Sequence, residues 1–269
     1  MTLGYWNRKM AGLEVPAASG ILTISLLVLA AATGARTVGF ALNRIIDRHI
    51  DAKNPRTAIR DLPSGRMTLN QAYGVMIVGA LVYLAAAASI NSLCLILSPI
   101  PLAVFVIYPF LKRFTHWAHF GVGLSLALGP LGGYFAINPV IDSHIWPVLW
   151  LFLFTWCWVA GFDIIYATYD EEFDKKEGLF SFPSVFGKKK ALKYSGIIHV
   201  LAFILLCGVY GAAFFGSIVV AVLLAVSGYL LYLEQNKAED IELAFFKINA
   251  VLGFVVFAFV FTGVQLALP

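Results

Sequence analysis

Eight apolar segments dominate this 269-residue chain, and each is about as long as the roughly 20 residues that a helix needs to cross a bilayer. They lie at 18–46, 69–90, 92–111, 117–137, 146–169, 194–212, 214–233 and 244–268. Hydrophobic residues make up 60% of the chain and charged residues only 13%, which excludes an ordinary soluble domain. The sequence predicts an all-α membrane protein, a bundle of about eight transmembrane helices forming a single domain over 1–269.

The loops between these segments differ sharply in charge. Loops rich in Lys and Arg lie at 52–67, 112–116 and 170–193. Connections without Lys or Arg lie at 90–92, 138–145 and 211–217. Because basic loops stay on the cytoplasmic side, we expect a multi-pass protein of the inner membrane, if bacterial, with the basic loops in the cytoplasm. Topology also accounts for the net charge of +4, so we expect no nucleic-acid partner.

Residues 1–17 form a short polar N-terminal segment. The segment is too short and too polar to cross a membrane, and it lacks the apolar region of a signal peptide. Eight spans would place both termini outside, which leaves Arg8 and Lys9 on the unexpected side. One further helix before residue 18 would remove that conflict.

Polar residues follow one face of the first span towards its cytoplasmic end. Asn43, Asp47 and Asp51 recur every four residues, so they share a helical stripe, and Arg36 lies seven residues earlier on the same stripe. The fifth span ends in the same way. Its stripe contains Asp163, Tyr166, Asp170 and Asp174.

A single carboxylate at a helix end is usually there because water solvates it. Solvation alone does not readily explain two acidic stripes at one depth. Four gathered aspartates would repel each other, whereas hard oxygen ligands suit Mg²⁺, which completes its shell with water and phosphate oxygens. Lys53 and Arg56 follow the first stripe and Lys175 follows the second, so cations are available for a diphosphate. Topology alone is the alternative explanation for these basic residues.

The two stripes resemble the signatures of the UbiA superfamily of intramembrane prenyltransferases. The first signature continues as AKNPRTAIRDLPSGRMT, similar to the arginine-rich run of the family, and the second is followed by EGLFSFPSVFG. The segment YPFLKRFTHW at 108–117 matches a third family element and contributes Lys112 and Arg113. These matches extend from about 36 to 187.

The resemblance implies nine helices around a central cavity, with the first helix of the family absent here. It also implies Mg²⁺-dependent transfer of a polyprenyl group from a polyprenyl diphosphate to an aromatic acid in quinone synthesis. Arg36 and the second signature resemble the branch that uses 4-hydroxybenzoate or 1,4-dihydroxy-6-naphthoate. The acceptor stays open between these two acids.

The resemblance also assigns roles to individual residues. Ligands of Mg²⁺ would be Asn43, Asp47, Asp51, Asp170 and Asp174. Cations for the diphosphate would be Lys53, Arg56, Lys112, Arg113 and Lys175. Arg36 would clamp the acceptor carboxylate, and Asp163 or Tyr166 would orient the acceptor hydroxyl or accept a proton. The alternatives are an intramembrane arginine bonded to carbonyl groups and, for Asp163 and Tyr166, structural hydrogen bonds.

Two other interpretations stay open. One is a UbiA-type prenyltransferase with another acceptor. The other is an ion-coupled transporter, although transporters usually hold their acidic residues near the middle of the bilayer. The five histidines are scattered, and we assign them no function.

Overall fold

The computed structural model describes residues 1–267, and every regular element within that range is helical. The α-helices are α1 (Thr2–Met10), α2 (Ala18–Lys53), α3 (Leu69–Ile90), α4 (Ser92–Leu97), α5 (Pro99–Leu111), α6 (Ala118–Ile137), α7 (Trp146–Ala167), α8 (Glu171–Glu177), α9 (Phe182–Phe186), α10 (Lys188–Val209), α11 (Ile218–Asn236) and α12 (Asn249–Ala267). Short 3₁₀ or π turns are η1 (Ser143–Ile145), η2 (Thr168–Asp170), η3 (Tyr210–Phe214) and η4 (Glu242–Ile248).

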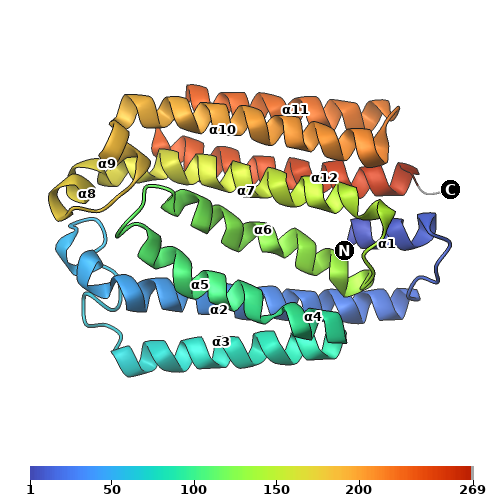
Figure 1. Ribbon diagram of the computed structural model, residues 1–269, viewed down its shortest axis with the longest axis horizontal. Coiled ribbons are helices and arrows are strands. Elements are labelled where there is room, and N and C mark those ends of the chain that lie inside the picture. Colours follow the sequence, from blue (N-terminus) through green and yellow to red (C-terminus); the bar gives the residue numbers. More distant parts are fainter. Residues whose placement is uncertain (268–269) are drawn as a thin grey trace.

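Eight helical stretches within residues 1–267 are long and apolar enough to cross a membrane, which confirms the predicted membrane bundle. They are α2, α3, α4–α5, α6, α7–α8, α10–η3, α11 and η4–α12. The long helices run side by side along one direction, with α8, α9 and the loop after α2 at one end (Figure 1). The other end carries α1 and the end of α12. We call the first end the pocket end.

Helix α2 is longer than the apolar segment that predicted it. It continues from residue 46 to Lys53, so Asp47 and Asp51 lie on the helix, as their four-residue spacing predicted. Both carboxylates are therefore held on a rigid backbone. The helix ends at Asn54, directly before Pro55, where a following proline disfavours helical geometry.

Side chains at the pocket end stop and restart the helices within a few residues. Thr68 begins α3 with a capping box that it forms with Gln71. Gly178 ends α8 with a φ of 69°, and a second capping box between Ser181 and Ser184 begins α9. These caps fix the course of the chain between the second acidic stripe and α10.

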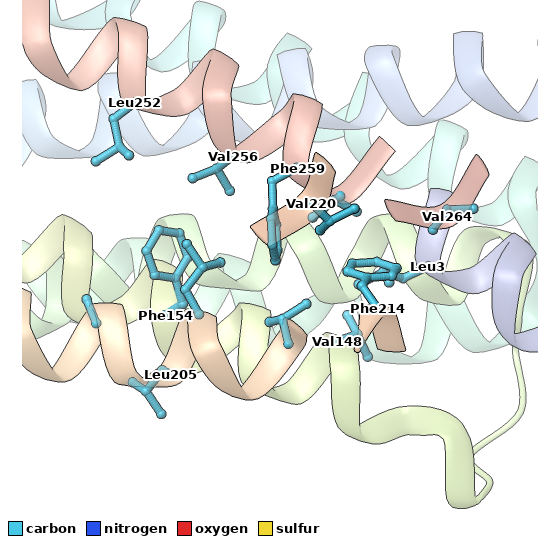
Figure 2. Packing of buried hydrophobic residues seen from close by; sticks show 14 of the residues in the cluster. Leu3, Val148, Phe154, Leu205, Phe214, Val220, Leu252, Val256, Phe259 and Val264 are labelled. Atoms are coloured by element: carbon cyan, nitrogen blue, oxygen red, sulfur yellow. The ribbon is translucent and has the colours of Figure 1, made fainter. Parts of the chain in front are cut away.

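Apolar side chains pack between α7, α10, α11 and α12 in the largest core cluster (Figure 2). Phe154, Phe259 and Leu252 are completely buried in it. By contrast, Leu22, Leu26 and Leu29 on α2 are all about 60% exposed, as expected of a face that contacts lipid. The apolar composition is thus divided between a packed interior and a lipid-facing surface.

Helices α2 and α3 approach each other closely because small residues meet at their crossing. A Cβ atom on Gly34 would lie 2.7 Å from the carbonyl oxygen of Gly79 and 2.7 Å from the amide nitrogen of Tyr83. Neighbouring membrane helices gain packing energy when small residues let their backbones meet in this way.

The N-terminal segment is more ordered than its polar composition predicts. Residues Thr2–Met10 form α1, which packs against α6 and α12 at the end opposite the pocket. Leu3 and Trp6 enter the main core cluster, and Asn7 donates hydrogen bonds to the hydroxyl of Tyr134 and to Asp142. The segment is therefore a short helix that contributes to the core.

Candidate active site

A cavity of about 210 Å³ opens at the pocket end, between α2, α5, α6, α7 and the loop that follows α2. Ionisable residues make up much of its lining. They are Asp47, Asp51, Arg56, Arg60, Tyr108, Lys112, His119, Asp163, Tyr166, Asp170 and Asp174. Segments that lie far apart in the sequence meet here, so the two acidic stripes face one cavity.

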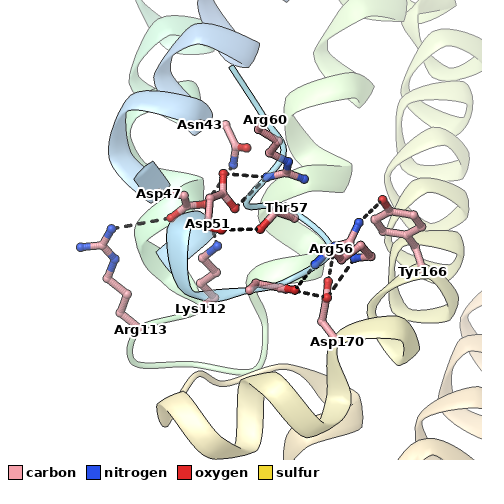
Figure 3. Close-up of polar contacts among 11 residues, drawn as sticks. Asn43, Asp47, Asp51, Arg56, Thr57, Arg60, Lys112, Arg113, Tyr166 and Asp170 are labelled. Carbon is pink, nitrogen blue, oxygen red and sulfur yellow. Dashed lines mark hydrogen bonds and ion pairs between the residues drawn. The ribbon is translucent and has the colours of Figure 1, made fainter. Parts of the chain in front are cut away.

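The aspartates of α2 are buried and each is paired with a cation (Figure 3). Asp47 is 2% exposed, and its Oδ2 lies 2.6 Å from Nζ of Lys112. Asp51 is 4% exposed, and Nη1 of Arg60 lies 2.8 Å from both of its carboxylate oxygens. Buried carboxylates need such partners, because an unpaired charge loses its hydration without compensation.

Asp170 is the corresponding centre of the second stripe. Nε of Arg56 lies 3.0 Å from Oδ1 of Asp170, Nη2 of Arg56 bonds Oδ2, and Asn54 adds a hydrogen bond of 2.8 Å. Nη1 of Arg56 also donates to the hydroxyl of Tyr166 over 2.6 Å. Burial acts to lower the pKa of Arg56, but Asp170 outweighs it and the pKa lies above its ordinary value. Arg56 therefore stays charged while tying the loop to α7.

The spacing of the second stripe predicted one continuous α-helix, but the structure divides the stripe between two helices. A 3₁₀ turn at Thr168–Asp170 separates α7 from α8. Asp163 and Tyr166 lie on α7 and Asp174 lies on α8, yet all three line the cavity together with Asp170. The turn redirects the chain without removing the stripe from the cavity.

The donor set of the cavity fits Mg²⁺. Asn43, Asp47, Asp51, Asp170 and Asp174 all line it, and their oxygen atoms are the hard ligands that this ion prefers. Five carboxylates and three cations line the cavity, and Arg113 at its rim approaches Asp47, so the carboxylates outnumber the cations. Oδ1 of Asp47 is buried without a hydrogen-bond partner. Within residues 1–267 no three acidic, His or Cys side chains converge as a complete ligand group, so substrate oxygens or water would have to contribute.

The predicted diphosphate cations separate into two groups. Arg56 and Lys112 line the cavity. Lys53 pairs with Glu177 and Lys175 with Glu171, and both lysines are largely exposed outside the lining. Arg113 lies at the rim, donates to the carbonyl of Ile46 and approaches Oδ1 of Asp47 to 3.6 Å.

Arg36 is not brought to the cavity. Its side chain is exposed, and its guanidinium lies 4.6 Å from the centre of the Phe40 ring. At this depth Gly39 is the residue of α2 that packs against α5, through the ring of Phe105. Seven-residue spacing fixes the position of a Cα atom on a helix, but it does not fix the direction of a long side chain. The predicted carboxylate clamp therefore has no support from this arrangement.

Several lining residues were missing from the sequence-based assignment, and Arg60 and His119 are the two that have ion-pair partners in the cavity. Arg60, the partner of Asp51, lies in the arginine-rich run, where its role depends on the path of the loop. His119 lies at the start of α6 with Nδ1 2.7 Å from Oδ2 of Asp163. Its proximity to the segment at 108–117, which resembles a family element, was the available signal, but a single histidine on an apolar helix carries little information.

Comparison with known proteins identifies the family. The model of the UbiA prenyltransferase family matches residues 10–251, nearly the whole chain. The chain belongs to the UbiA prenyltransferase family. It is 31% identical over 242 residues to a 4-hydroxybenzoate octaprenyltransferase of Francisella tularensis subsp. novicida, covering 88% of this chain and 81% of the relative. A Serratia proteamaculans enzyme of the same name is 29% identical over 255 residues, covering 94% of this chain and 85% of that enzyme.

Solved structures of UbiA homologues share the fold. The apo structure of a homologue from Aeropyrum pernix has a TM-score of 0.78 and 32% identity, covering 98% of this chain and 96% of that one. A homologue from Archaeoglobus fulgidus, bound to GPP and Mg²⁺, has a TM-score of 0.71 at 20% identity, covering 98% of this chain and 94% of that one. Family and fold together make this chain an integral membrane prenyltransferase of the UbiA type.

Proposed function

We propose that this UbiA-family enzyme transfers a polyprenyl group from a polyprenyl diphosphate to the ring of 4-hydroxybenzoate, with Mg²⁺ as cofactor. The observation that carries this proposal is the shared cavity, where two acidic stripes face each other across paired cations. The names of the bacterial relatives support 4-hydroxybenzoate as acceptor. The Archaeoglobus homologue with bound GPP and Mg²⁺ supports a metal-assisted diphosphate site.

The proposed roles at the diphosphate follow from the ion pairs. Asn43, Asp47, Asp51, Asp170 and Asp174 would hold Mg²⁺, which when bound supplies positive charge beside the diphosphate. Arg56, Arg60 and Lys112 already line the cavity, each on a carboxylate. These cations would donate to phosphate oxygens and stabilise the negative charge of the leaving group.

The proposed transfer forms a carbon–carbon bond and releases diphosphate. The bond between the allylic carbon and the diphosphate oxygen breaks, and the diphosphate leaves with the electron pair. The ring carbon beside the acceptor hydroxyl bonds the allylic carbon, and that ring carbon then loses its proton to restore aromaticity. Asp163 and Tyr166 line the cavity near this step, and Asp163 is the stronger candidate for the base, because the hydroxyl of Tyr166 already accepts a hydrogen bond from Arg56.

The proposed orientation places the pocket end in the cytoplasm. The loop after α2, the end of α5 and the segment through α8 and α9 all lie there and carry the Lys- and Arg-rich loops. The positive-inside bias of membrane proteins supports this orientation.

A membrane-fraction assay tests the proposed function. Membranes containing the wild type receive Mg²⁺, a long-chain polyprenyl diphosphate and either 4-hydroxybenzoate or 1,4-dihydroxy-6-naphthoate, and prenylated product is measured. We expect product with 4-hydroxybenzoate and its loss in Asp47→Ala and Asp170→Ala. Asp61→Ala is the matched control, because Asp61 is exposed and paired with Arg66 in the same region. Product from the naphthoate alone would show that 4-hydroxybenzoate is not the acceptor. No product from either acid would refute the proposed prenyl transfer to these aromatic acids.

A further inference from the structure

His119 links three elements at the wall of the cavity. It lies in the first turn of α6, is 5% exposed and lines the cavity. Its Nδ1 lies 2.7 Å from Oδ2 of Asp163 on α7. Its Nε2 lies 3.3 Å from the backbone nitrogen of Phe182, the first residue of α9. Both ring nitrogens are therefore engaged, one by a side chain of the cavity and the other by the main chain.

The main-chain contact decides which ring nitrogen carries the proton. A backbone N–H can only donate, so Nε2 of His119 must be the acceptor from Phe182. An imidazole whose Nε2 accepts carries its hydrogen on Nδ1. Nδ1–H then donates to Oδ2 of Asp163. The contacts thus select one neutral tautomer, and that tautomer presents a donor to the carboxylate.

Asp163 is held by one oxygen and leaves the other for a substrate. The hydrogen bonds within residues 1–267 engage only its Oδ2. Its side chain is 23% exposed and lines the cavity. A carboxylate that is fixed through one oxygen by a hydrogen-bond donor keeps its other oxygen oriented towards the cavity, which is the geometry a general base needs.

We propose that His119 is a positioning residue that holds Asp163 as the base for the ring proton of the aromatic acceptor. The inference rests on the proposed function. After the new carbon–carbon bond has formed, the C–H bond at that ring carbon breaks and its electron pair returns to the ring. The proton passes to Oδ1 of Asp163, which becomes a neutral carboxylic acid and later releases the proton to water. His119 does not take the proton, because its Nε2 lone pair is occupied by Phe182.

A purely structural role for His119 would depend on Nε2 rather than on Nδ1. In that case the contact that matters is Nε2 with Phe182, which ties α6 to α9. Two amide side chains separate these roles. The amide of Asn reaches the position of Nδ1 and can donate to Asp163, whereas the longer amide of Gln reaches the position of Nε2 and can accept from Phe182.

The experiment compares His119→Asn and His119→Gln in purified enzyme with Mg²⁺, a polyprenyl diphosphate and 4-hydroxybenzoate. We expect kcat of the Gln variant to be about 10- to 100-fold lower than that of the Asn variant. KM for the polyprenyl diphosphate should be similar in the two variants. With an acceptor deuterated beside its hydroxyl, the primary isotope effect should increase in the Gln variant, because removal of the ring proton has become slow. His116→Gln is the control, since His116 packs against the rings of Trp117, Phe182 and Phe186 and does not line the cavity.

If His119→Asn and His119→Gln both lose stability, a double-mutant cycle that compares kcat still tests the inference. Asp163→Asn combined with His119→Gln should be no slower than Asp163→Asn alone, because His119 acts only through that carboxylate. Additive losses would overturn the inference. So would equal losses in the Asn and Gln variants, or a slower Asn variant. A wild type that forms no product would instead refute the proposed function itself.

Discussion

Arg60 and Arg66 lie six residues apart in one loop, yet only Arg60 pairs with a buried partner. Nη1 of Arg60 bonds both oxygens of Asp51 at the cavity, whereas Arg66 pairs with Asp61 where both side chains are 62% exposed. Exposed pairs contribute little, whereas a buried carboxylate that loses its partner carries a large penalty. The two arginines therefore form a matched pair for mutation.

We predict that Arg60→Gln raises KM for the polyprenyl diphosphate about 10- to 100-fold, the effect of losing one charge-assisted hydrogen bond. Arg66→Gln should stay within about 2-fold of wild type, as expected of an exposed pair. Steady-state kinetics of both variants in the same detergent check this. Equal effects of the two substitutions would show that Arg60 does not reach the diphosphate.

At the scale of helices, the crossing of α2 and α3 depends on the absence of a side chain at Gly34. A Cβ atom there would lie 2.7 Å from backbone atoms of α3, which cannot move independently of the helix. We predict that Gly34→Ala destabilises the protein by roughly 1–3 kcal/mol. Gly74→Ala is the control, because nothing lies within 4 Å of its added Cβ and alanine favours the helix. Thermal unfolding in detergent measures both, and equal melting temperatures would disprove the close-packing account.

Helix α1 should contribute to stability rather than to substrate binding. Trp6 is 6% exposed in the core cluster, at the end of the bundle opposite the cavity. We predict that Trp6→Ala lowers the free energy of unfolding by on the order of 3 kcal/mol and leaves KM for the polyprenyl diphosphate unchanged in the folded fraction. Met10→Ala, at a site that is 47% exposed, should have little effect. A raised KM with normal stability in Trp6→Ala would contradict this assignment.

Helices were predictable where hydropathy or side-chain spacing alone determines them. The apolar segments predicted all eight membrane-crossing stretches, and the spacing of Asp47 and Asp51 predicted their common face. The packing of α1 was not predictable, because its few apolar residues become buried only against α6 and α12. Arg36 lies outside the cavity for a similar reason, since the neighbours of α2 at that depth determine which face is enclosed, and its role stays a prediction.

In the whole molecule, one end of the bundle is polar and open while the other is closed by α1. The sequence placed both acidic stripes at the same depth, so it predicted that they would meet. It named Arg56 as a cation of the site but predicted neither its pairing with Asp170 nor the pair Asp51–Arg60, because both pairs depend on how the loop after α2 folds back over the cavity. Long-range pairing of this kind is a property of the tertiary structure.

The gathering of five carboxylates at the cavity is the central physical feature of the site. A diphosphate would add further negative charge to these carboxylates, so binding without a divalent cation should be strongly unfavourable. With Mg²⁺, the carboxylates and the phosphate oxygens share the same ion. The whole cavity should therefore bind its diphosphate and its metal together.

The most direct test is binding of a non-reactive polyprenyl thiolodiphosphate to purified protein, measured by calorimetry with Mg²⁺ and with EDTA. We predict that wild type and Asp61→Asn bind at least about 10-fold more tightly with Mg²⁺, and that Asp47→Asn loses this difference. Equal affinity of the wild type in Mg²⁺ and in EDTA, or a full Mg²⁺ effect in Asp47→Asn, would contradict the assignment of this cavity as the metal–diphosphate site.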